Sequence, residues 1–231
     1  MEMSCTFVSQ INMRFIPSLY IQNGKVVSFY KGNDNELKKH YPKAPKNYAH
    51  WFATQGANTL FVVDFDGYQW DRLDEIRPVF PGEIWWAGQV RDLDSIQNLL
   101  DRGANRIVLG ESAQSIYSEA LARFGADKLI AGLKVKHGDQ GADQCEVLLG
   151  TGFTDVLVKD LNAEGTLFMP SFDIFEKCVY FSQMNVYASG GLSEERHIEL
   201  LKRIGVKGAV IGRALYENKV NLKTLQRQFP E

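Results

Sequence analysis

Short apolar runs alternate with amphipathic stretches along most of this 231-residue chain. Between the apolar runs, hydrophobic residues recur at helical spacing, as at Ile96, Leu99 and Leu100 after the helix-capping residue Asp92. Eight strands that alternate with helices predict a parallel sheet, and eight units in a chain of this length predict a single (βα)8 barrel. The predicted strands are Arg14–Tyr20, Thr59–Phe65, Glu83–Ala87, Arg106–Leu109, Lys128–Lys134, Asp155–Asp160, Val186–Ala188 and Gly208–Ile211.

Glycine, proline and polar residues mark the turns and loops. Asn23-Gly24 is a strong tight-turn signal, so Lys25–Tyr30 is expected to return as a short strand beside the first one. Asn33–Lys46 is polar and contains two prolines, and we expect it to form a long loop on the catalytic side of the barrel. Further predictions are the glycine-rich loop His137–Gly141 and the helices Asn47–Gln55, Ala113–Phe124 and Asn218–Gln228.

The two halves of the chain resemble each other. Leu60–Asp64 resembles Val156–Asp160, and an offset that places Gly88 on Gly190 also aligns the helix that follows. We therefore expect one domain over residues 1–231, made of two half-barrels at approximately 14–124 and 125–231. The positions that match at this offset are Ile96 with Ile198, Leu99 with Leu201, Gly103 with Gly205, Val108 with Val210, and Gly110 with Gly212.

Two glycine-containing turns follow consecutive predicted strands near the end of the chain. Glycine suits a backbone that approaches an anion closely or takes a positive φ, and the loops after strands seven and eight of such barrels commonly bind phosphate. The alternative is that these are ordinary turn glycines. Because two such turns are joined by one helix, we expect a phosphate site at Ser189, Gly190, Gly191, Gly212 and Arg213, with Gly165 and Thr166 from the preceding loop.

The composition and charge of the chain exclude several classes of binding partner. A formal net charge of −2 and no basic run beyond Lys38-Lys39 argue against nucleic acid and acidic membrane surfaces. Cys5, Cys145 and Cys178 are scattered and the four histidines do not cluster, so we expect no metal and a reducing, cytoplasmic environment. No apolar run approaches a membrane span, and the N-terminus lacks the pattern of a signal peptide. We expect a monomer that binds a phosphorylated small molecule. Whether it also has a protein partner stays an open question at this point.

Several motifs together resemble one family nearly from end to end: the HisA family, the isomerases of histidine biosynthesis. The ending Asp64-Phe65-Asp66-Gly67 is similar to HisA rather than to its sister cyclase family, HisF. The motifs that carry the resemblance are Ile16-Pro17-Ser18 with Asn23-Gly24-Lys25, Gly56-Ala57 through Gly67, Asp160 with Glu164-Gly165-Thr166, Ala188-Ser189-Gly190-Gly191, and Ile211-Gly212-Arg213-Ala214-Leu215.

The resemblance implies a cofactor-free and metal-free Amadori rearrangement, in which a bis-phosphorylated aminoimidazole carboxamide ribotide changes from an aminoaldose to an aminoketose. The family uses two aspartates, at the ends of strands one and five, to donate and accept the proton. Tyr20 and Lys134 stand at those positions here, and Lys159 replaces a threonine of the strand-six motif. The standard activity is therefore expected to be altered or lost.

The first-half phosphate turn departs from the family as well. The segment Ala87–Arg91 stands where the family has three glycines and an arginine, and Gly110-Glu111 where it has Gly-Thr. A carboxylate repels a phosphate at short range, and a side chain at Gln89 hinders close backbone approach. We expect a weaker second phosphate site at Gly88, Arg91 and Gly110.

Five side chains at strand ends are candidate catalytic groups: Lys134, Lys159, Asp64, Tyr20 and Asp160. One hypothesis is that burial and like charges depress the pKa of a lysine, which would make its amine a nucleophile or base. The alternative is that each lysine lies at a loop edge or neutralises a carboxylate such as Asp160. Tyr20 is either a proton donor or a packed ring, and Asp64 is either a base or a partner of the neighbouring backbone.

Three function classes remain open, because descent does not settle activity. The first is an isomerase of HisA type with altered or lost standard activity. The second is a lysine-dependent lyase or aldolase that acts on a phosphorylated metabolite. The third is a non-catalytic paralogue that binds such a metabolite.

Overall fold

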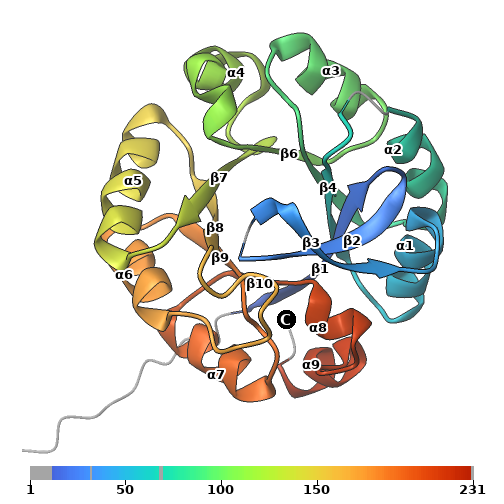
Figure 1. The fold of residues 1–231 in the computed structure, drawn as a ribbon. Helices are drawn as coiled ribbons and strands as arrows, with labels where there is room; N and C mark the ends of the chain where they lie inside the picture. The colour runs from blue at the N-terminus through green and yellow to red at the C-terminus, as the bar shows by residue number, and fades with distance from the viewer. Residues whose placement is uncertain (1–11, 32, 68–69, 230–231) are drawn as a thin grey trace, which may run out of the picture.

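The computed structural model describes residues 12–31, 33–67 and 70–229, and only the backbone of residues 33–38. Eight parallel strands close into a ring, as predicted, because the last strand pairs with the first (Figure 1). Each lies next to its neighbour in the chain order, as the barrel topology requires. The barrel strands are β1 (Arg14–Gln22), β4 (Thr59–Asp64), β5 (Glu83–Ala87), β6 (Arg106–Leu109), β7 (Leu129–Val135), β8 (Asp155–Asp160), β9 (Asn185–Ser189) and β10 (Gly208–Ile211).

A hairpin extends from the end of β1. β2 (Lys25–Tyr30) pairs antiparallel with β1 after the predicted turn, in which Asn23 and Gly24 both have positive φ. The prediction of a loop over Asn33–Lys46 is wrong, because Asn33–Tyr41 forms β3, which pairs antiparallel with β2. A polar sequence becomes a strand here through backbone pairing, since β-propensity depends strongly on context. In Figure 1 this hairpin lies over the centre of the ring.

The helices surround the barrel (Figure 1). They are α1 (Pro45–Thr54), α2 (Trp70–Ile76), α3 (Leu93–Asp101), α4 (Tyr117–Phe124), α5 (Gly138–Thr151), α6 (Phe172–Ser182), α7 (Glu195–Ile204), α8 (Arg213–Tyr216) and α9 (Leu222–Gln228), with 3-10 turns at Arg77–Val79 and Glu111–Ile116. None of the helices in the described ranges is long and apolar enough to cross a membrane.

Three predicted boundaries need correction. The supposed loop His137–Gly141 is mostly helix, because α5 begins at Gly138 despite the glycines of its first turn. The predicted helix Ala113–Phe124 is divided into a 3-10 turn and α4. The last helix begins at Leu222 rather than at Asn218, because the Asn221 side chain accepts a hydrogen bond from the Thr224 amide and caps it there.

Two apolar layers hold the barrel together. Alternate strand residues point to opposite faces of a sheet, so Trp85 belongs to the interior cluster while Trp86 packs in the outer layer beneath the helices. The interior cluster includes Tyr20, Phe29 and Leu157. Phe29 comes from the hairpin rather than from a barrel strand, so the hairpin forms part of the wall of any site at this end.

Candidate functional site

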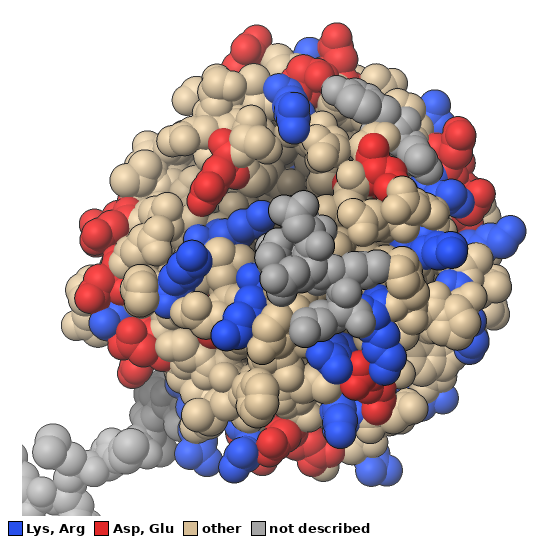
Figure 2. Space-filling model, viewed as in Figure 1, with Lys and Arg blue, Asp and Glu red and all other residues tan. Residues whose placement is uncertain are grey.

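Two hollows open where the carboxyl ends of the barrel strands meet the hairpin. The smaller measures about 50 Å³ and lies among the loops that follow β8, β9 and β10; we call it the glycine pocket, after Gly190, Gly191 and Gly212. The larger measures about 290 Å³ and lies above β4 to β8; we call it the lysine chamber, after Lys134 and Lys159. On this face, several Lys and Arg side chains lie near the centre (Figure 2).

The turn after β9 has a backbone that only glycine fits. Gly190 has φ +105° and Gly191 has φ +70°, both in the left-handed region. A Cβ at Gly190 would lie 2.6 Å from the carbonyl oxygen of Asp160, and a Cβ at Gly191 would collide with the carbonyl oxygen of Phe168. The turn therefore leaves bare backbone facing the glycine pocket. The helix α7 starts only at Glu195, beyond this turn.

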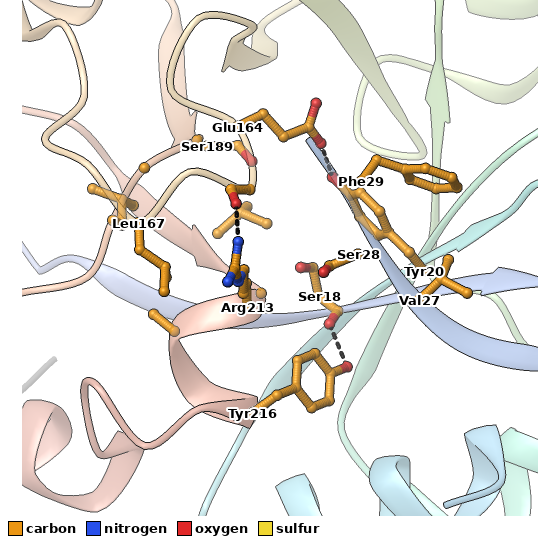
Figure 3. A pocket seen from close by; sticks show the side chains of 17 residues that line it. Ser18, Tyr20, Val27, Ser28, Phe29, Glu164, Leu167, Ser189, Arg213 and Tyr216 are labelled. Atoms are coloured by element: carbon orange, nitrogen blue, oxygen red, sulfur yellow. Dashed lines mark hydrogen bonds between the residues drawn. The ribbon is translucent and has the colours of Figure 1, made fainter. Parts of the chain in front are cut away.

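Hydroxyl groups line the glycine pocket together with the glycines. Gly212 packs against β1 so closely that a Cβ there would lie 2.6 Å from Ser18 Oγ. Ser28, from β2, also lines the pocket (Figure 3). Its buried Oγ makes no hydrogen bond of good geometry within the described residues, although the Tyr41 hydroxyl lies near it. Ser189 is a third buried hydroxyl residue at this wall.

Arg213 lines the pocket with a guanidinium that is already anchored. Its Nε donates to Oε1 of Glu217 at 2.7 Å, and its Nη1 donates to the carbonyl oxygen of Gly165 at 2.5 Å. Burial alone would raise the pKa of Glu217, but hydrogen bonds from Arg213 and Lys39 lower it. Arg213 is thus a fixed cation beside the pocket (Figure 3).

Gly165 and Thr166 have different places in the loop after β8. Gly165 lines the glycine pocket and has φ +65°, and its Cα lies so close to the hairpin that a Cβ would collide with the carbonyl oxygen of Phe29. Thr166 is not among the residues that line either hollow. Its Oγ1 donates to the Ala163 carbonyl at 2.7 Å and accepts from the Phe168 amide at 3.0 Å, which shapes the loop.

Three side chains from distant segments meet between the two hollows. The Lys159 Nζ lies 2.8 Å from Oε1 of Glu164, and the Tyr20 hydroxyl donates to the same oxygen at 3.0 Å. The Lys159 ammonium also lies 4.7 Å from the centre of the Tyr20 ring. Only 12 % of the Lys159 side chain and 8 % of the Glu164 side chain are exposed. Lys159 and Glu164 thus form a buried ion pair, and the Lys159 ammonium makes a cation–π contact with the Tyr20 ring.

The cluster holds both Lys159 and Tyr20 in their protonated forms. Burial by itself would lower the pKa of Lys159, but the Glu164 carboxylate raises it above its usual value. The hypothesis of a depressed pKa is therefore wrong for Lys159, and its amine remains a cation. Burial and the Glu164 charge also raise the pKa of Tyr20, so its phenol cannot act as a base near neutral pH.

Asp64 and Asp160 end matching strands and both bind the backbone that follows. Oδ1 of Asp64 accepts from the Asp66 amide at 2.9 Å, and burial raises the pKa of this carboxyl. Oδ1 of Asp160 accepts from the Asn162 amide at 2.9 Å and the Ala163 amide at 3.2 Å. Its Oδ2 accepts from the Ser171 amide at 2.8 Å. Asp160 lines neither hollow, whereas Asp64 lines the lysine chamber.

Lys134 differs from Lys159. It is exposed at the end of β7, lines the lysine chamber, and forms no ion pair within the described part of the chain. The chamber floor beneath it is apolar and includes Phe61, Val108 and Leu157. Among the predicted catalytic groups, the chamber therefore brings together Lys134, Lys159 and Asp64.

The first-half turn also borders the lysine chamber. A Cβ at Gly88, which has φ +110°, would collide with the Asp64 carbonyl, just as Gly190 meets that of Asp160. Gln89 has φ +53°, so a side chain occupies a backbone conformation that favours glycine. Its Oε1 accepts from Nη2 of Arg91 at 2.9 Å. Gly110 lines the chamber, but Glu111 does not.

The described residues contain no group of three or more His, Cys, Asp or Glu placed to hold a metal ion. A family model described as "Histidine biosynthesis protein" matches residues 14–221, which is most of the chain. The chain belongs to the histidine biosynthesis protein family. The resemblance found in the motifs around Asp64 and Gly190 is thus confirmed, together with the barrel fold.

Relatives match the chain over nearly its whole length. A protein of Lachnoclostridium phytofermentans is 28 % identical over 240 residues, covering 95 % of this chain and 100 % of the relative. One of Alkaliphilus metalliredigens is 30 % identical, covering 93 % and 98 %, and one of Francisella philomiragia is 30 % identical, covering 91 % and 98 %. Each is named as an imidazole-4-carboxamide isomerase, and the name includes two phosphoribosyl groups.

Sequence reasoning missed three contributors to the site in this family member. Ser28 could not be recognised from the sequence, because its pocket forms only when the hairpin crosses the barrel. Glu164 was noted as part of a motif, but its pairing with Lys159 and Tyr20 joins positions far apart in the chain. Tyr216 lines the glycine pocket and donates to the Ser18 carbonyl at 2.7 Å (Figure 3). The sequence around Tyr216 does not indicate its hydrogen bond to Ser18.

Proposed function

We propose that this protein binds a phosphorylated small molecule in the glycine pocket and does not carry out the standard aminoaldose–aminoketose isomerisation at a useful rate. One observation carries the proposal. Tyr20, at a position where the family has an aspartate, is fixed against Glu164 and Lys159 with its phenol protonated. The second aspartate position holds Lys134. A proton transfer between adjacent carbons needs an acid and a base that face each other, and this pair has no carboxylate.

Phosphate binding is supported by the composition of the pocket. Backbone at Gly190, Gly191 and Gly212 is bare, Ser18 and Ser28 bring hydroxyl groups, and Arg213 is an anchored cation. Oxyanions are bound by such combinations of backbone amides, hydroxyls and arginine. The first-half turn has the side chain of Gln89 where the other turn has Gly191, and it is the weaker candidate.

A second candidate function rests on Lys134 alone. Its exposed amine lies at the rim of the lysine chamber, above an apolar floor, and has no carboxylate partner among the described residues, so it is accessible to a carbonyl compound for Schiff-base formation. Lys159 is excluded from that role by its ion pair with Glu164. Borohydride reduction in the presence of a pool of phosphorylated aldehydes and ketones, followed by peptide mass spectrometry, tests this candidate. Adducts at Lys134 would support it.

Two assays test the first candidate. The purified protein is incubated with the bis-phosphorylated ribotide, and the gene is expressed in a histidine auxotroph that lacks its own isomerase. We expect neither turnover nor growth, while phosphate still raises the unfolding temperature of the protein, and raises that of the Ser28→Ala variant less. Strong growth that is lost with Asp64→Asn or Lys134→Ala would show a different acid–base pair and contradict the proposal.

A further inference from the structure

The glycine pocket and the lysine chamber are separated by a wall. Phe29 and Glu164 line both hollows, while Tyr20 faces the glycine pocket and Lys159 faces the lysine chamber. These four residues, which we call the dividing wall, stand between the two glycine turns. A molecule that extends from Gly190 to Gly88 has to pass through them.

Main-chain contacts fix the hairpin side of the wall. The Lys31 amide donates to the Glu164 carbonyl at 2.7 Å, so the end of β2 is joined to the loop after β8. Gly165 lies against the Phe29 carbonyl, where no other residue would fit. The Phe29 ring is 2 % exposed and packs edge-on against Phe65, with their centres 4.7 Å apart. The hairpin therefore spans the opening and places an aromatic ring at its centre.

Buried charge fixes the other side of the wall. Glu164 receives both the Lys159 ammonium and the Tyr20 hydroxyl, and Tyr20 packs near Phe29 with ring centres 6.4 Å apart. To move one member aside, the protein would have to leave a buried charge without its partner, which is strongly unfavourable. The wall is thus resistant to displacement by a ligand.

We infer that the dividing wall restricts this protein to ligands with a single phosphate, held in the glycine pocket, and excludes a molecule with a phosphate at each end. This inference rests on the proposed phosphate site. The relatives are named for a compound with two phosphoribosyl groups, so the inference gives this chain a different class of ligand. The weaker first-half turn agrees with it, because the side chain of Gln89 lies where the other turn has Gly191 and hinders close approach of a second phosphate to the backbone.

Isothermal titration calorimetry with three probes tests the inference: inorganic phosphate, ribose 5-phosphate and the bis-phosphorylated ribotide. We expect ribose 5-phosphate to bind the natural protein at least as tightly as the ribotide does. Phe29→Ala opens the wall without touching a charge, and it should raise the ratio of the affinity for the ribotide to the affinity for ribose 5-phosphate about tenfold. Ser112→Ala is the control, because Ser112 lines the lysine chamber alone and is not part of the dividing wall.

The outcomes are distinguishable. If the natural protein binds the ribotide far more tightly than ribose 5-phosphate, and Phe29→Ala changes neither, the wall does not select the ligand and the inference is wrong. If neither inorganic phosphate nor ribose 5-phosphate binds, the proposed phosphate site fails and the inference falls with it. If Phe29→Ala unfolds, crystals of the natural protein soaked with the ribotide decide: continuous density from Gly190 to Arg91 past Phe29 overturns the inference, and density confined to the glycine pocket supports it.

Discussion

Tyr20 and Glu164, 144 positions apart in the chain, are joined by a hydrogen bond of 3.0 Å in the interior of the barrel mouth. The bond engages the phenol of Tyr20, at a position where the resemblance implies an aspartate. Its acceptor is the carboxylate of Glu164, which is not one of the two aspartates that the resemblance implies for catalysis. The same oxygen of Glu164 holds Lys159. Tyr20 thus packs near Phe29 and donates to Glu164, while Lys159 neutralises the carboxylate.

Changes in this cluster should have unequal effects on stability. Tyr20→Phe removes one hydrogen bond and should lower the free energy of unfolding by about 1 kcal/mol. Lys159→Met leaves Glu164 as a buried charge without its cation and should cost about 3–5 kcal/mol. Combining Lys159→Met with Glu164→Gln should cost less than Lys159→Met alone. Urea unfolding measures all three, and Arg196→Ala, in an exposed ion pair with Glu194, is the control with an effect below about 1 kcal/mol.

Ser28 should contribute to phosphate binding but not to folding. Among the residues that the structure describes, its buried Oγ makes no hydrogen bond of good geometry, so Ser28→Ala should leave the unfolding temperature without phosphate nearly unchanged. With phosphate bound, the loss of one hydrogen bond should weaken the affinity by about three- to tenfold. Thermal shift titration with inorganic phosphate provides both values. Ser112→Ala, which changes only the lysine chamber, should have no effect; equal effects of both variants would refute a role for Ser28.

The two strand-end aspartates should respond differently to amidation. Asp160 uses both carboxylate oxygens to accept backbone amides, so Asp160→Asn turns an NH2 group toward a donor and should cost about 1–3 kcal/mol. Asp64 accepts from the Asp66 amide through Oδ1, and burial already raises the pKa of this carboxyl. Asp64→Asn keeps that acceptor and removes a poorly solvated charge, so we expect a smaller change. Denaturant unfolding at neutral pH compares the two, and an equal cost would contradict this interpretation.

Glu217 should make the protein sensitive to acid. Hydrogen bonds from Arg213 and Lys39 outweigh burial and lower its pKa in the folded state. Its stabilising contribution is thus complete above the unfolded pKa of about 4.3 and is lost as the pH falls through the lower folded value. Glu217→Gln should be less stable than the natural protein at pH 7, and the difference should shrink on acidification. A difference that stays constant between pH 7 and pH 3 would rule out this linkage.

Restoring the aspartates alone should not restore efficient isomerisation. Tyr20→Asp places a carboxylate beside Glu164, where like charges in a buried site raise a pKa and oppose each other. Combined with Lys134→Asp it should produce weak activity, and the addition of Phe29→Ala should increase that activity by opening the dividing wall. The assay is turnover of the bis-phosphorylated ribotide. A double variant with full activity would show that the wall is no obstacle.

Much of the fold could be read from local patterns. β5, β6 and β10 begin and end where the apolar runs predicted, and Asp92 caps α3 through the Ser95 amide. The polar strand β3 could not be predicted, because its stability comes from pairing with β2 rather than from its own residues. The start of α5 at Gly138 was missed for a similar reason, since packing against α6 overrides the local glycine signals.

The candidate site was predictable only where it depends on backbone. The need for glycine at Gly190 and Gly191 followed from the strand-turn pattern, and their positive φ values agree with it. The repulsion expected from Glu111 has no support from the lining of the lysine chamber, which does not include that residue. The charge state of Lys159 depends on Glu164, which is brought to it by the loop after β8. No pattern within either segment contains that information.

The glycine pocket draws its residues from both ends of the chain. Ser18 and Ser28 come from the first two strands, whereas Gly212 and Arg213 follow the last one. During synthesis, the early strands leave the ribosome long before their partners exist, so the pocket cannot form until Arg213 has emerged and β10 has joined β1. A phosphate bound at the proposed site would therefore have affinity only for chains whose barrel is already complete, and it would stabilise the barrel after its last strand has paired.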